Sequence, residues 1–279
     1  MILPINAGKI SNQSTLSPNF RANIRSPRLQ FSNKDFFIRI RGYGRNKSWA
    51  ESVKQTADTA TILIRNKCGF DNLMRFITAG IIRANKLTKD EAKKFHTGIL
   101  RTERESYRYG SDWDGHDLVT YYEKIPRYKI YYKKLNQTIE KPLKNPYPDI
   151  DLTIPIKDSS NYIKHGDSEK VNFGLDIIEE LYYKLLSKYS PQKVTSKELK
   201  DITNSIAEIR WLMAHITPWE RGSDAISNVF MRALFKTYGI KTTPSAKNIS
   251  FDMEAYCTNL KEYQKKFPNF FEKAPKVIE

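Results

Sequence analysis

The segment Pro218-Trp-Glu-Arg-Gly-Ser-Asp224 separates two apolar stretches of the chain, and its position between them decides the fold that we expect. The stretch before it opens with Thr195-Ser-Lys-Glu198, a capping box that satisfies backbone N–H groups at the start of a helix. Apolar residues then follow at helical spacing: Ile202, Ile206, Ile209, Leu212 and Met213. The stretch after the segment opens near Gly222 and extends to Tyr238. The sequence therefore predicts two apolar helices joined by a short turn.

This turn combines features that favour the binding of an anion. Gly222 and Ser223 stand where the second helix begins, so their backbone N–H groups lack a partner within the helix. Arg221 adds a guanidinium, which can bind a phosphate through two parallel hydrogen bonds. A helix N-terminus with such a neighbour suits a phosphate or diphosphate. An alternative of equal weight is that Ser223 caps the helix and Arg221 pairs with a nearby carboxylate.

Capping boxes and apolar periodicity predict further helices on both sides of this pair. They span residues 48–66, 71–87, 88–104, 171–187 and 250–263. Residues 111–162 differ, because several prolines interrupt them and two short runs, 128–132 and 151–156, suit small strands. We therefore predict a mostly α (α+β) fold, with one domain over residues 36–279 and a β-containing insert at about 111–162.

The 279-residue chain carries 47 Lys and Arg against 31 Asp and Glu, which gives a net charge of +16. Half of this excess lies in residues 1–48, where nine basic residues accompany a single acid. Residues 1–35 show no apolar period, and we interpret them as a flexible basic leader. A charge of this size implies an anionic partner but does not identify it.

Several classes of protein are excluded by what the sequence lacks. No apolar stretch approaches the ~20 residues that span a bilayer. The N-terminus does not have the pattern of a secretory signal peptide, and Ile2 excludes N-myristoylation. Two cysteines cannot form a disulfide framework or a four-thiolate zinc site. We therefore expect no transmembrane segment and no metal site.

Residues 120–148 interleave seven basic residues with six tyrosines. Basic and aromatic side chains together are typical of surfaces that bind phosphates and stack bases. They also fit a solvated surface on which the tyrosine rings are half buried, and we favour this interpretation. A nucleic-acid partner is therefore the less favoured hypothesis.

Several motifs in the C-terminal half occur in the order and spacing of a known family. They are Leu181-Tyr182, Ile209-Arg-Trp-Leu212, Pro218-Trp-Glu-Arg-Gly-Ser223, Tyr238-Gly-Ile240, Phe251-Asp-Met-Glu-Ala255 and Glu262-Tyr263. In this arrangement the chain resembles the AvrB family of bacterial type III effectors over about residues 160–267, and more faintly over 88–131. The resemblance implies a bilobal domain with a fold similar to that of Fic proteins.

The resemblance also implies a nucleotide pocket. The phosphate-binding arginine of the family matches Arg221, at the predicted helix start. A threonine of that pocket looks like Thr120, a histidine looks like His165, and an aspartate matches Asp252. Asp252 or His165 would then hold a sugar or deprotonate an acceptor hydroxyl, and the sequence does not decide between these roles.

The same comparison speaks against AMP transfer. Fic adenylyl transferases resemble this turn through the motif H-P-F-x-x-G-N-G-R. When the motif is aligned on Pro218 and Gly222, its catalytic histidine falls on Thr217 and its last arginine on Ala225. A threonine cannot act as a base at neutral pH. His215, two residues upstream, would point in another direction on a helix.

The resemblance implies an effector that is secreted into a host cell and works in its cytoplasm. Its activity would be the transfer of a sugar from a nucleotide-sugar, which is a donor and not a permanently bound cofactor, to a Ser or Thr of a host protein. The alternative is a non-catalytic effector that holds a nucleotide in the pocket and docks host proteins with its surface. Incubation with labelled nucleotide-sugars and host proteins distinguishes the two.

Overall fold

The computed structural model describes residues 29–37, 39–40, 46–101, 126–157, 161–191 and 194–278. These residues form a mostly helical protein with small antiparallel strand pairs, which confirms the predicted class. The α-helices are α2 (Lys47–Arg65), α3 (Phe70–Ala84), α4 (Lys89–Lys94), α6 (Pro126–Glu140), α7 (Val171–Lys188), α8 (Ser196–Ile216), α9 (Ser223–Thr237), α10 (Phe251–Tyr256) and α11 (Leu260–Lys266). Strand β1 (Ile154–Lys157) pairs with β2 (Asn161–Lys164), and β3 (Ile240–Lys241) pairs with β4 (Lys276–Val277).

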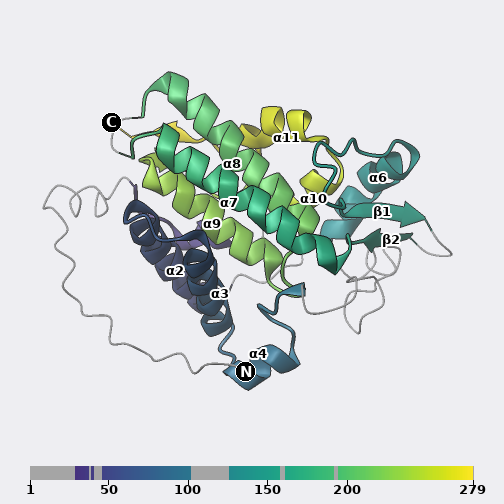
Figure 1. The fold of residues 1–279 in the computed structure, drawn as a ribbon, viewed down its shortest axis with the longest axis horizontal. Coiled ribbons are helices and arrows are strands. Elements are labelled where there is room, and N and C mark those ends of the chain that lie inside the picture. The colour runs from purple at the N-terminus through teal and green to yellow at the C-terminus, as the bar shows by residue number, and fades with distance from the viewer. Residues whose placement is uncertain are drawn as a thin grey trace, which may run out of the picture.

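Helix α8 is the centre of the fold (Figure 1). It packs against α7, α9, α10 and α11, while α2 and α3 pack against each other and against α9. Nearly every residue of α8 from Ile206 to Ile216 is buried, as expected for a helix that is covered on all sides. The β1–β2 pair and α6 lie together at one end of the helical layers. The predicted pair of apolar helices, α8 and α9, is confirmed.

The capping boxes predicted from the sequence are confirmed at two helices and wrong at one. Thr195 and Glu198 bond each other's backbone N–H groups at the start of α8, and the box at residues 88–91 does the same for α4. The predicted box at residues 48–51 is not formed. Asn46 caps α2 instead, because its Oδ1 accepts a hydrogen bond from Trp49 N at 2.9 Å. Asparagine is as effective as serine at this position, so the helix starts earlier than predicted.

Two predicted helices are shorter than expected because the chain turns. The helix predicted over 88–104 ends with α4, and His96 then adopts a left-handed backbone with φ of 54°. The helix predicted over 250–263 is divided into α10 and α11, with Asn259 as the N-cap of the second.

The strand predicted at residues 128–132 is wrong, because this segment belongs to helix α6. Proline is favoured in the first turn of a helix, so Pro126 begins α6 instead of interrupting it. Tyr131 is buried and its hydroxyl donates to Glu254 Oε1 at 2.7 Å. This tyrosine therefore has a structural role and is not part of a stacking surface. The strand predicted at 151–156 is confirmed in part by β1.

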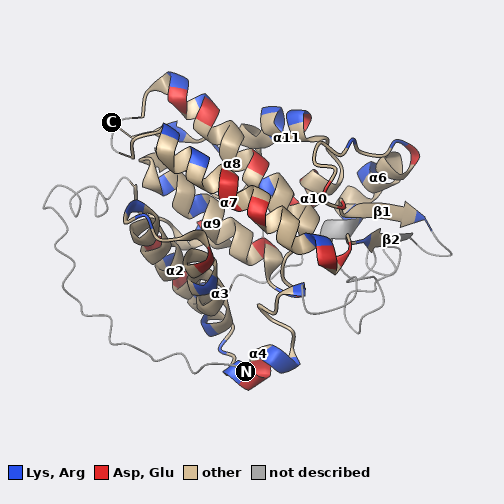
Figure 2. Ribbon diagram, viewed as in Figure 1, with Lys and Arg blue, Asp and Glu red and all other residues tan. Residues whose placement is uncertain are grey.

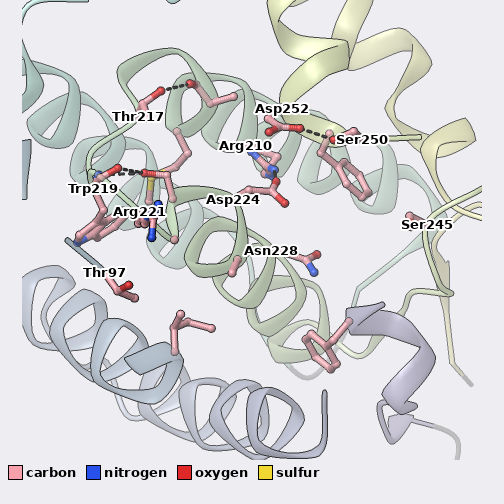
Figure 3. Close-up of a pocket in the computed structure, with 18 of the residues that line it drawn as sticks. Thr97, Arg210, Thr217, Trp219, Arg221, Asp224, Asn228, Ser245, Ser250 and Asp252 are labelled. Carbon is pink, nitrogen blue, oxygen red and sulfur yellow. Dashed lines mark hydrogen bonds and ion pairs between the residues drawn. The ribbon is translucent and has the colours of Figure 1, made fainter. Parts of the chain in front are cut away.

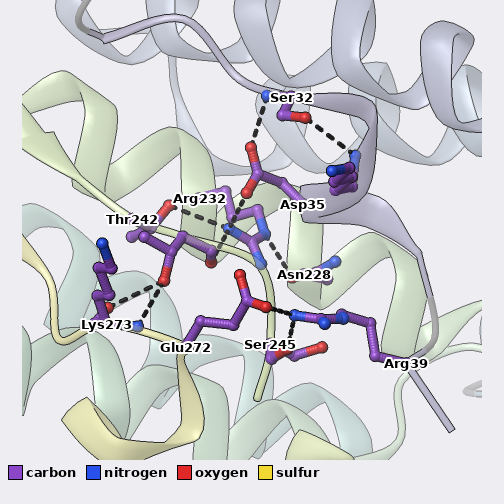
Figure 4. Close-up of polar contacts among 11 residues, drawn as sticks. Ser32, Asp35, Arg39, Asn228, Arg232, Thr242, Ser245, Glu272 and Lys273 are labelled. Atoms are coloured by element: carbon purple, nitrogen blue, oxygen red, sulfur yellow. Dashed lines mark hydrogen bonds and ion pairs between the residues drawn. The ribbon is translucent and has the colours of Figure 1, made fainter. Parts of the chain in front are cut away.

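The predicted leader is wrong for its last residues, because residues 29–35 are packed on the domain (Figure 4). Ser32 caps a short 3-10 helix over Asn33–Phe36. Phe31 is buried, and its ring centroid lies 4.6 Å from Lys236 Nζ. Asp35 is also buried, with Oδ1 3.6 Å from NH1 of the fully buried Arg232. The segment thus covers two cations of α9. Residues 1–28 lie outside the described part of the chain.

No helix in the described ranges is long and apolar enough to cross a membrane.

His215, in the last turn of α8, is a buried structural residue. Its ring packs against Trp211, with 4.1 Å between ring centroids, and against Tyr256. Its Nδ1 lies 3.1 Å from the carbonyl oxygen of Thr153, and its Nε2 lies 3.1 Å from that of Ala255. Burial lowers the pKa of His215 to about 3, against the opposing effect of these carbonyls. The ring therefore joins α8 to the start of the β1–β2 pair and to α10.

Replacement of Asp35 by alanine should lower the free energy of unfolding by ~3–5 kcal/mol, because it leaves the buried Arg232 without its carboxylate. Glu51→Ala is the control, since Glu51 pairs with Lys54 on the surface and should contribute less than ~1 kcal/mol. Urea unfolding measures both changes. A loss for Asp35→Ala no larger than the control would show that residues 29–35 do not stabilise the domain.

The pKa of His215 predicts how stability depends on pH. Because this pKa is about 3 in the folded protein against an ordinary 6.5, the unfolded chain binds the extra proton between these values. The histidine should therefore remove ~1.4 kcal/mol of stability for each pH unit between about pH 6.5 and about pH 3. His215→Gln keeps a hydrogen-bond donor without titrating, so its unfolding free energy should fall less steeply from pH 7 to pH 4. Parallel curves for the two proteins would contradict this assignment.

Candidate functional site

A cavity of about 540 Å³ lies beside the turn between α8 and α9 (Figure 3). Its walls come from the last turn of α8, the first turns of α9, the start of α10 and the segment containing Asp35. Arg221 and Trp219 lie at one end in Figure 3, and Ser245 lies at the other. Arg210 and Asp224 lie between the two ends. The volume is typical of pockets that bind small molecules.

Arg101 fixes the end of α8 beside this cavity. The last carbonyl groups of a helix have no partner within it, and positive charge is favoured there. The fully buried Arg101 donates from NH1 to the carbonyl oxygens of Ile216 and Thr217, at 2.9 and 3.1 Å, and from NH2 to that of Gly166. It therefore ties the end of α8 to the loop that carries His165.

Two threonine hydroxyls bind the neighbouring carbonyls of α8. Thr153 Oγ1 donates to His215 O at 2.6 Å, and Thr217 Oγ1 donates to Ala214 O at 2.8 Å. Thr217 has φ of 40°, in the left-handed region that β-branched residues rarely adopt. Its own hydrogen bond and those of Arg101 hold it there. The chain turns sharply at this residue and enters the segment that carries Arg221.

Backbone hydrogen bonds to residues 96–101 hold both sides of Arg221. Arg221 N donates to His96 O at 3.1 Å, and Gly98 N donates to Arg221 O at 2.9 Å. Further along, Glu220 N donates to Ile99 O and Arg101 N donates to Pro218 O. The backbone of Arg221 is thus fixed, and its half-buried side chain lines the cavity.

The start of α9 also faces this cavity. Gly222 is the N-cap, with φ of 94°, which glycine adopts without strain. Ser223 Oγ accepts a hydrogen bond from Trp219 N at 2.9 Å and donates to Trp219 O at 2.8 Å. The hydroxyl therefore closes the turn. It does not cap α9, so the alternative interpretation of Ser223 as the helix cap is wrong. Helix N-termini favour negative charge, which suits an anion at this end of the cavity.

A buried arginine further along the cavity pairs with one carboxylate and lies near a second. Arg210 NH2 forms an ion pair with Asp224, and the centre of its guanidinium lies 5.6 Å from the Phe251 ring. Burial alone would lower the pKa of Arg210, but Asp224 and, more weakly, Asp252 help to raise it. Asp252 Oδ1 accepts hydrogen bonds from Met253 N, at 2.8 Å, and from the Ser250 hydroxyl. Asp252 is thus fixed in the first turn of α10.

His165 lies in the cavity wall, between the β1–β2 pair and the end of α8. Its Nδ1 lies 3.1 Å from Thr153 Oγ1 and 3.3 Å from Thr217 Oγ1. Burial lowers the pKa of His165 to about 3, and Arg101 lowers it further while Asp252 opposes the shift. The imidazole is therefore neutral at physiological pH, although it lies near a carboxylate.

The structure brings five of the six predicted site residues to this one cavity: Asp252, His165, Arg221, Gly222 and Ser223. The sixth, Thr120, lies outside the described residues. Sequence reasoning assigned no role to four further residues that build the site: Arg101, Thr153, Arg210 and Asp224. The sequence contains one local indication that Arg210 is special, because it is a charged residue within the apolar run of α8. Arg101 and Thr153 had none, because they reach the site only through tertiary packing.

The charge distribution gives no support to a nucleic-acid surface in the part of the chain that the structure describes. Basic and acidic residues lie side by side on α2, α7 and α8 (Figure 2). In the tyrosine-rich stretch, Tyr131 is buried against Glu254 and the Tyr147 hydroxyl donates to Glu208. Among the described residues, no group of three or more His, Cys, Asp and Glu side chains is placed to hold a metal ion.

Comparison with known proteins identifies the family. A family model described as "Avirulence protein", AvrB_AvrC, matches residues 82–274, a range that includes all of α6 to α11 and every cavity residue named above except Asp35. A search of curated proteins finds no match. The match covers more than half of the chain and agrees with the motifs around Arg221 and Asp252. The chain therefore belongs to the AvrB_AvrC family of avirulence proteins, a family of bacterial effectors.

Proposed function

We propose that the protein transfers a sugar from a nucleotide-sugar to a Ser or Thr hydroxyl of a host protein after delivery into the host cell. The proposal rests on one observation: Arg221, the N-terminus of α9, His165 and Asp252 all line the same cavity. Arg221 and the first backbone N–H groups of α9 lie where they could bind a diphosphate, and Asp252 lies further along the cavity. A leaving diphosphate is stabilised by groups of the first kind, and an acceptor hydroxyl needs a base such as Asp252.

The proposed reaction makes one bond and breaks another. The acceptor oxygen bonds to the anomeric carbon of the sugar, and the bond from that carbon to the phosphate oxygen breaks. The nucleoside diphosphate leaves with the electron pair, so negative charge grows on its outer phosphate. Arg221 and the backbone amides of Gly222 and Ser223 would stabilise this charge. The proton of the acceptor hydroxyl passes to a base, for which Asp252 and His165 are the candidates.

The proposal does not extend to AMP transfer, because the geometry at the position of the Fic histidine does not suit it. Thr217 stands there, and its hydroxyl proton is directed to Ala214 O. His215 is buried between α8, Thr153 and α10, and both of its nitrogens contact backbone carbonyls. Neither side chain is placed to deprotonate an incoming hydroxyl.

Arg221→Ala should weaken the binding of nucleoside diphosphates at least roughly tenfold, because each charge-assisted hydrogen bond contributes ~1.5–3 kcal/mol. Arg221→Lys should recover part of the affinity, since an ammonium cannot form two parallel hydrogen bonds. Arg75→Ala, on the exposed face of α3, is the control and should leave affinity unchanged. Calorimetric titration measures affinity, and thermal melting measures stability. A large loss of stability in Arg221→Ala with unchanged nucleotide affinity would assign Arg221 a structural role instead.

Incubation with labelled nucleotide-sugars and host proteins tests the transfer itself. We expect label on Ser or Thr of a host protein, and its loss when Asp252 is replaced by Asn. Nucleotide-sugar binding without transfer to any host protein would favour the alternative, an effector that docks host proteins without catalysis. The absence of binding by any nucleotide-sugar would contradict both interpretations.

A further inference from the structure

A second cavity, of about 540 Å³, lies at the opposite end of α8 from the cavity described above, and the two share no lining residue. Its wall is formed by residues within 196–204 of α8 and 261–265 of α11, together with Pro268 and Pro275. Helices α8 and α11 pack against each other (Figure 1). The proposed sugar transfer makes no use of this second cavity.

The wall of the second cavity carries positive charge without a compensating carboxylate. Lys200 of α8 and Lys261 and Lys265 of α11 line it, and the remaining lining residues are uncharged. The cavity beside Arg221 has a different balance, because its three arginines are accompanied by four carboxylates: Asp35, Glu220, Asp224 and Asp252. Of these two cavities, the second is therefore the one whose overall charge favours an anion.

The carboxylates that are near these lysines in the sequence do not neutralise them. Glu198 belongs to the capping box at the start of α8, and Glu262 pairs with Lys266 at 2.5 Å. Asp201 is exposed and does not line the cavity. In the part of the chain that the structure describes, no carboxylate forms an ion pair with Lys200, Lys261 or Lys265. Their charges are thus available to a ligand.

A threonine hydroxyl in the same wall also lacks a protein partner. Thr203 is only 5% exposed, and its hydroxyl forms no hydrogen bond with any described residue. Thr61, by contrast, is buried in α2 and donates to Ala57 O at 2.8 Å. The Thr203 oxygen is not fully enclosed by protein atoms, and the residue lines the cavity. Its hydroxyl is therefore free to bond a ligand oxygen there.

From these observations we infer that the second cavity binds a small ligand that carries two or more phosphate groups. Lysine binds phosphate as a point charge, so ammonium groups from two helices can contact different phosphates of one ligand. Ser196, in the first turn of the 21-residue helix α8, also lines the cavity, and a helix N-terminus favours negative charge. The volume is typical of pockets that bind small molecules. The inference does not depend on the proposed function.

Calorimetric titration of the full chain with inorganic tripolyphosphate and with inositol hexakisphosphate tests this site. Lys200→Gln combined with Lys265→Gln should weaken binding more than roughly tenfold, because charge-assisted hydrogen bonds are lost. The control combines Lys197→Gln with Lys184→Gln, which removes two exposed lysines of α8 and α7 that do not line the cavity. It should leave affinity nearly unchanged. An equal loss in the two double variants would show a response to overall charge alone and would overturn the site.

Thr203→Val tests the cavity without changing any charge. It keeps the shape of the side chain and should weaken tripolyphosphate binding severalfold, whereas Thr61→Val, in α2, should not weaken it. Thermal melting verifies that both variants are folded. Arg221→Ala should retain this binding, because Arg221 lines the other cavity. Loss of binding in Arg221→Ala, with Lys200→Gln and Lys265→Gln without effect, would place the phosphates beside Arg221 and overturn the inference.

Two further measurements identify the source of the phosphate groups. Binding to phosphatidylcholine vesicles that contain phosphatidylinositol bisphosphate, lost in the double variant of Lys200 and Lys265, would support the site and assign the ligand as a lipid headgroup. Binding of the soluble compounds alone would support it and assign a free phosphorylated molecule. No binding of either kind would overturn the inference. Binding of a hexaglutamate peptide as tight as that of tripolyphosphate would overturn the preference for phosphate.

Discussion

Ala214, His215 and Ile216 end α8 with carbonyl groups that no later residue of the helix can bind. In this protein their partners are side chains from elsewhere: Thr217 in the turn, Thr153 before β1, and Arg101 from the segment after α4. Each partner contributes to the site as well. Arg101 holds the loop of His165, Thr153 and Thr217 contact its ring, and the backbone of residues 96–101 pairs with the turn that carries Arg221. The site is thus built from the groups that complete one helix end.

Buried positive charge is the second feature of this architecture. Arg101, Arg210 and Arg232 are all fully buried, and each has a different kind of partner. Arg101 binds carbonyl oxygens, Arg210 pairs with Asp224, and Arg232 donates to Asn228 and Thr242 while Asp35 lies nearby. Burial of a charge is costly unless such partners are present. Arg210 and Arg232 line the cavity together with their carboxylates, Asp224 and Asp35, so their charges are balanced within the cavity wall.

The sequence predicted the helices well where local signals agree with tertiary packing. The capping box at Thr195, the apolar spacing of α8 and the glycine before α9 all indicate the structure that forms. Prediction from the sequence failed where one local signal is compatible with two different structures. Pro126 was interpreted as a helix breaker and is a helix start. The capping box at Thr88 indicates where a helix begins but not where it ends, and the chain turns at His96. At the site, the motif around Arg221 was sufficient to predict that Arg221, Gly222 and Ser223 lie together, and all three line the cavity. The contributions of Arg101 and Thr153 depend on packing between segments 62 and 115 residues apart, which no local pattern contains.

The contacting residues are far apart in the sequence, and this also affects when the site forms during folding. Contacts between distant segments form late in folding, because the loops that they close must lose their entropy first. The bonds from Arg101 and Thr153 to the end of α8 belong to this class, as does the approach of Asp35 to Arg232. A chain that has formed its helices but not these bonds has no fixed turn at Arg221 and no ordered histidine. For a member of an effector family, the cavity therefore has its complete wall only in a chain whose whole domain has folded.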